Sequence, residues 1–91
     1  MPIGFIGGSA PAMVAQISEG YFLVNANTFR GWAKGDLQNL RAELDKALRD
    51  VRATVPPQDD ARQNQIRNWK IGRLSSAIQI VQGAMTGRRG A

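Results

Sequence analysis

The sequence has no cysteine and no histidine among its 91 residues. Without thiols, disulfides and thiolate metal sites are excluded, and without imidazole the commonest general acid–base catalyst is excluded as well. The remaining polar residues form no arrangement typical of a catalytic or metal-binding site. We therefore expect a protein that is not an enzyme and that uses no cofactor.

Charge is scarce in the first 29 residues, where Glu19 is the one charged side chain. Glycines at positions 4, 7, 8 and 20 and Pro11 interrupt the apolar residues of this segment. No apolar run therefore approaches the roughly 18–20 residues that cross a bilayer. No Lys or Arg precedes Arg30, so the basic start of a classical signal peptide is missing. We expect no transmembrane helix and no classical secretory route, and a membrane is a disfavoured partner.

The clearest pattern is a set of apolar residues that recur at spacings of three and four. They are Leu37, Leu40, Leu44, Ala47, Leu48 and Val51. This spacing places them on one face of a helix, which we expect to cover residues 28–54. Asn27 or Thr28 could be an early N-cap and Asp36 a later one, and Thr28 is favoured.

Two consecutive prolines must end this helix. Pro56 disfavours helical backbone angles at Val55, and neither Pro56 nor Pro57 has an N–H to donate. Asp59 and Asp60 suit the N-terminus of a second helix, expected over residues 59–85. The sequence thus predicts an all-α, single-domain protein: an apolar, Gly-rich arm (1–27), a helical hairpin (28–87) turning at 56–58, and a basic tail (88–91).

The second helix has more apolar surface than one partner helix covers. One stripe consists of Ile71, Leu74, Ile78, Val81 and Met85, and beside it lie Ile66, Trp69, Ala77, Ile80 and Ala84. Residues 74–87 contain no charge, and their polar side chains are amides and hydroxyls, which can be buried when they are hydrogen-bonded. We expect another protein surface to cover this helix.

The arm adds further apolar area. Residues 12–18, after Pro11, suit a short helix, whereas the run at 21–24 suits either a strand or a helical turn and is expected to be buried. We expect the arm to pack on neighbouring copies. The predicted self-association interface is Ile3, Phe5, Ile6, Met13, Ile17, Phe22, Ile66, Trp69, Ala77, Ile80 and Ala84.

The functional hypothesis that follows is a structural subunit that assembles with itself into a filament, tube or ring. The alternative is a small basic protein that binds nucleic acid or serves in phage virion assembly, since the net charge is +5. Its phosphate contacts would be Arg62, Arg67, Lys70, Arg73, Arg88 and Arg89, with Trp69 stacking on a base.

The order of elements resembles the needle and inner-rod subunits of bacterial type III secretion systems. The resemblance covers about half the chain, through LDKAL at 44–48, PP at 56–57 and QNQIRNW at 63–69. It implies a hollow helical polymer, with Arg73, Gln79 and Gln82 among the lumen-facing groups and the arm between neighbours. It also implies other assembly components as partners and export by a dedicated system; otherwise we expect a cytoplasmic or virion location.

Overall fold

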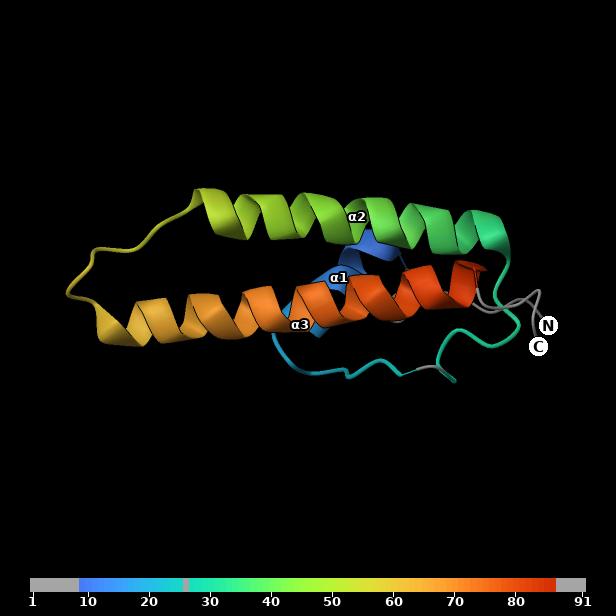
Figure 1. Cartoon of the computed structure of the whole chain (residues 1–91), viewed down its shortest axis with the longest axis horizontal. Helices are drawn as coiled ribbons and strands as arrows, with labels where there is room; N and C mark the ends of the chain where they lie inside the picture. The colour runs from blue at the N-terminus through green and yellow to red at the C-terminus, as the bar shows by residue number, and fades with distance from the viewer. Residues whose placement is uncertain (1–8, 26, 87–91) are drawn as a thin grey trace.

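The computed structural model describes residues 9–25 and 27–86. Their regular structure is entirely helical and consists of α1 (Ala10–Ser18), α2 (Lys34–Ala53) and α3 (Ala61–Thr86). Figure 1 shows α2 and α3 side by side as an antiparallel hairpin, with α1 lying across one face of the pair. The predicted all-α fold and the pair of long helices are confirmed. Residues 1–8 of the predicted Gly-rich arm and residues 87–91, which include the predicted basic tail, lie outside the described residues.

The hairpin turns where the prolines predict. The helix α2 ends at Ala53, and α3 begins after Asp60, whose Oδ1 accepts a hydrogen bond from the backbone N–H of Gln63 at 3.1 Å. The side-chain amide of Asn64 donates to the carbonyls of Pro57 and Asp60, each at 2.9 Å. Asp60 is therefore the N-cap of α3, close to the N-terminus at residue 59 that the sequence predicts, and Asn64 fixes the turn to the first turn of α3.

The short helix α1 has well-defined ends. The hydroxyl of Ser9 accepts a hydrogen bond from the N–H of Ala12 at 3.2 Å, and Pro11 stands in the first turn. At the other end, Gly20 has φ +82° and donates to Ile17 O at 3.1 Å, while Tyr21 donates to Gln16 O at 2.9 Å. These two bonds form a Schellman motif, which requires the left-handed conformation that glycine adopts without strain.

The predicted start of α2 is wrong by six residues. Thr28 caps no helix, because its hydroxyl accepts a hydrogen bond from the N–H of Asn25 at 2.9 Å and so stabilises a turn. Gly31, with φ +79°, then interrupts the helical conformation. The N-cap position is Ala33, which makes no side-chain cap bond, and Asp36 lies inside the first turn, where a negative charge is favourable.

The core lies where the three helices meet. Its twelve buried side chains among the described residues are Ala10, Met13, Val14, Ile17, Phe29, Trp32, Leu37, Leu40, Leu44, Leu74, Ala77 and Val81. The rings of Phe29 and Trp32 meet edge to face, with their centroids 5.1 Å apart. The predicted second cover for α3 is thus supplied by α1 of the same chain, which packs on both α2 and α3.

Candidate functional site

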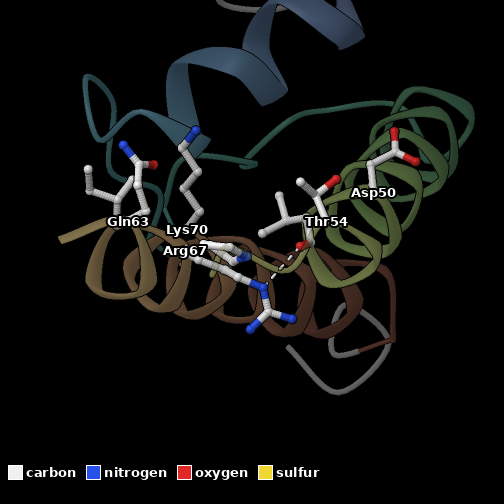
Figure 2. Close-up of a pocket in the computed structure, with 8 residues that line it drawn as sticks. Asp50, Thr54, Gln63, Arg67 and Lys70 are labelled. Carbon is white, nitrogen blue, oxygen red and sulfur yellow. Dashed lines mark hydrogen bonds between the residues drawn. The ribbon is translucent and has the colours of Figure 1, made fainter. Parts of the chain in front are cut away.

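Three basic side chains of α3, those of Arg67, Lys70 and Arg73, have partners inside the chain. Arg67 donates from Nε to the carbonyl of Val51 at 3.2 Å and from Nη2 to the carbonyl of Arg52 at 3.0 Å. Figure 2 shows the Arg67 guanidinium reaching across from α3 to the last turn of α2. The last carbonyls of a helix have no helical hydrogen-bond partner, and the helix C-terminus has a partial negative charge. Arg67 donates hydrogen bonds to two of these carbonyls of α2, and its positive charge interacts favourably with the helix end.

Two further basic residues hold α1 on the hairpin. Arg73 donates from Nη1 to the carbonyl of Ser18, the last residue of α1, at 3.0 Å. Lys70 pairs with Glu19, with Nζ and Oε2 3.3 Å apart. About half of the Glu19 side chain is exposed, so this ion pair contributes less than about 1 kcal/mol. The guanidinium of Arg73 also lies close to Gly20: a Cβ at position 20 would approach its Cζ to 2.9 Å.

These contacts change the interpretation of the predicted polyanion-binding residues. Arg67, Lys70 and Arg73 use donors or charge to join helices, while Arg62 is exposed. Arg88 and Arg89 lie outside the described residues. The two partners of Arg67 are 16 and 15 residues away in the sequence and the partner of Arg73 is 55 residues away, so no local pattern could have revealed these roles.

We expect Arg67→Ala to lower the free energy of unfolding by about 1–2 kcal/mol, because two hydrogen bonds from a charged donor to the α2 C-terminus are lost. Urea unfolding followed by circular dichroism measures the loss. The matched control is Arg62→Ala, which removes the same side chain from an exposed position of the same helix. Equal stability of the two variants would contradict the capping role of Arg67.

A cleft of about 330 Å³ opens beside Arg67, at the turn end of the hairpin. Its lining residues are Asp50, Val51, Thr54, Pro56, Gln63, Ile66, Arg67 and Lys70. In Figure 2, Lys70 points from α3 toward α1. The cleft lining combines the carboxylate of Asp50 with the basic side chains of Arg67 and Lys70 and with the apolar side chains of Val51 and Ile66.

The predicted self-association residues fall into three groups. Met13, Ile17 and Ala77 are buried in the core of the single chain, so they are not at its surface. Phe22, Ile66, Ile80 and Ala84 are half-buried, and Trp69 is 52% exposed. Ile3, Phe5 and Ile6 lie outside the described residues. In the single chain, the half-buried residues and Trp69 are therefore the described members of this set that a second molecule could contact.

The run at 21–24 is neither a strand nor a helical turn in this structure, and its predicted burial is only half correct. Phe22 and Val24 pack against the core, whereas Tyr21 and Leu23 are 80% and 74% exposed. Successive side chains of an extended segment point to opposite sides, which explains this alternation. The apolar run was visible in the sequence, but which two residues face outward depends on the direction in which the chain leaves α1.

The second half of α3 presents polar, uncharged residues to solvent. Ser76, Gln79 and Gln82 are exposed, and so are Gly72 and Gly83. A Cβ at either glycine would meet nothing within 4 Å, so these glycines serve no packing within the chain. This face of α3 is neither charged nor covered.

The described residues contain no group of three acidic side chains placed to hold a metal ion. Within the same part of the chain, no helix combines the length and the apolar character needed to cross a membrane. Neither a protein-family model, nor a curated protein, nor a solved structure matches the chain.

Proposed function

We propose that the chain is a non-enzymatic structural subunit that assembles with copies of itself into a filament, tube or ring. The observation that carries the proposal is the exposure of Tyr21, Leu23 and Trp69 on a chain that already has a core. Contiguous exposed apolar side chains are typical of surfaces that another protein covers, and Tyr21 and Leu23 are only two residues apart. Tyr and Trp are also the residues that contribute most to protein interfaces.

The distribution of charge favours the surface that includes Tyr21 and Leu23. Copies of a chain with net charge +5 repel one another, so they approach most easily where charge is absent. Residues 20–29, which include Tyr21 and Leu23, contain no charge. The same holds for α3 from Leu74 to its end at Thr86. The proposed contacts use these uncharged surfaces together with Trp69, which lies on the basic half of α3.

The resemblance to secretion needle and rod subunits extends the proposal to a rod-like polymer exported by a dedicated system. In such a polymer Gln79 and Gln82, which are exposed, would face the lumen. Arg73 is a poorer lumen-facing candidate, because it donates to Ser18 and lies against Gly20.

The test combines Leu23→Glu with Trp69→Glu. Both side chains are exposed, so the fold should be retained, whereas a carboxylate at each contact should weaken association by at least about 100-fold. Light scattering and electron microscopy measure assembly, and circular dichroism checks the helices. The matched control is Gln38→Glu with Gln65→Glu, which adds the same charge at two exposed helix positions. Assembly lost equally in both variants would show a charge effect and contradict the proposed contacts.

A second candidate is the binding of nucleic acid, favoured by the half-exposed Trp69 on the basic half of α3. It is separated from the first candidate by adding a short oligonucleotide to the wild-type chain. Particles that form only with the oligonucleotide and dissolve in salt would support this candidate, because phosphate contacts are salt-sensitive.

A further inference from the structure

The helix α1 occupies a site that is built mainly by the hairpin. Four of the twelve buried side chains belong to α1, namely Ala10, Met13, Val14 and Ile17. The hairpin side of the core includes Leu40, Leu44, Leu74 and Ala77, which are fully buried. Removal of α1 would leave part of this apolar surface open to water. Any assembly through Met13, Ile17 or Ala77 therefore has to change the position of α1.

The polar contacts that attach α1 to its own hairpin are confined to the C-terminal end of α1. Beyond its apolar face, two polar contacts hold its C-terminal end: Arg73 to the Ser18 carbonyl and Lys70 to Glu19. A helix of nine residues is too short to persist alone in water, so α1 needs a hairpin to lie on. Nothing in these contacts requires that α1 and the hairpin belong to the same copy.

The segment that connects α1 to α2 could allow α1 to lie on the hairpin of another copy. The described residues 19–25 and 27–33 contain no regular helix or strand, and Gly20 has φ +82° where the chain leaves α1. Phe29 and Trp32 are buried and fix the far end of this segment to the hairpin. Between Gly20 and Phe29, Phe22 and Val24 pack against the core, whereas Tyr21 and Leu23 are exposed. In the single chain this connection therefore leaves two large apolar side chains in water.

We infer that assembly proceeds by exchange of α1 between copies, so that α1 of one copy occupies the hairpin site of a second copy. The exchanged contacts are the same as those within one chain, so the core loses nothing. Because α1 is connected to its own hairpin, its effective concentration there is high, and this favours the monomer in which α1 lies on the hairpin of the same chain. Burial of Tyr21 and Leu23 between two copies offsets this preference. This inference rests on the self-assembly proposed above, and it identifies α1 as the segment through which one copy contacts the next.

The exchange can be detected by cross-linking, because the native chain has no cysteine. Ala15 of α1 and Lys46 of α2 are exposed and line one cleft of about 260 Å³. Chains with Ala15→Cys are mixed with chains carrying Lys46→Cys, allowed to assemble and treated with a short bis-maleimide. Exchange predicts a mixed covalent dimer at a yield roughly ten times that of a control mixture in which Gln65→Cys replaces Lys46→Cys. Gln65 is exposed on α3 and does not line this cleft.

A second measurement locks α1 in place. A chain with both Ala15→Cys and Lys46→Cys is cross-linked within itself while dilute and is then concentrated. Exchange predicts that the locked chain stays monomeric, whereas the same chain capped with a single-headed maleimide assembles. If the locked chain forms particles, or if the mixed chains form particles without giving the mixed covalent dimer, the exchange of α1 is contradicted. Self-assembly would still stand in either case. Absence of particles from the wild-type chain overturns both proposals.

Discussion

Ile17→Asp is expected to detach α1 from the hairpin and to lower the free energy of unfolding by about 3–5 kcal/mol. Ile17 is 2% exposed, and its neighbours in the core are apolar side chains. The new carboxylate would have to stay buried without a partner or pull α1 into water. Because small domains are stable by only about 5–15 kcal/mol, much of the population could lose its fixed packing.

Urea unfolding monitored by far-UV circular dichroism measures this effect. Near-UV circular dichroism follows Trp32, which is buried in the same core. The matched control is Ala15→Asp, which places the same charge on the exposed face of α1 and should change stability by less than about 0.5 kcal/mol. If Ile17→Asp were as stable as Ala15→Asp, α1 would not pack on the hairpin of its own chain.

Leu74→Ala should produce a loss of similar size for a different reason. Leu74 is fully buried, and its truncation leaves a cavity in the core, which costs about 2–5 kcal/mol. Thermal and urea unfolding give the value. The control is the same chemical change at an exposed site, Leu23→Ala, with an expected effect below about 0.5 kcal/mol. Equal effects at the two positions would refute the placement of Leu74 in the core.

The parts of the fold that depend on neighbours in the sequence could be predicted. The prolines at 56 and 57 and the cap at Asp60 define the turn within a few residues. The spacing of Leu37, Leu40 and Leu44 likewise identifies the buried face of α2. In these cases the residues that determine the structure lie within the element itself or next to it in the sequence. Tertiary packing agrees with this local preference, so the local pattern was sufficient.

The parts that depend on distant contacts could not be predicted. Thr28 has the chemistry of a helix cap, but the aromatic pair of Phe29 and Trp32 enters the core and takes the backbone there into a turn. Arg67 and Arg73 were grouped with the other basic residues because a sequence does not show that two helices end against them. The apolar residues of α3 predict a second covering surface, and in this structure α1 of the same chain packs on α3.

The position of α1 therefore connects the fold with the proposed assembly. Within one chain α1 completes the core, and at its C-terminal end the chain still exposes Tyr21 and Leu23. A subunit of this kind has its own core and retains exposed apolar side chains for contact with a second copy. The same residues of α1 would then serve folding in the monomer and contact between copies in the polymer.

The most direct test of self-assembly is the mass of the purified wild-type chain measured by light scattering over a wide range of concentration. We expect the mass to rise with concentration above 9.9 kDa, the mass of one chain, and particles of uniform width to appear in electron micrographs. A mass that stays at 9.9 kDa at the highest concentration reached would contradict the proposal that this chain is a self-assembling structural subunit.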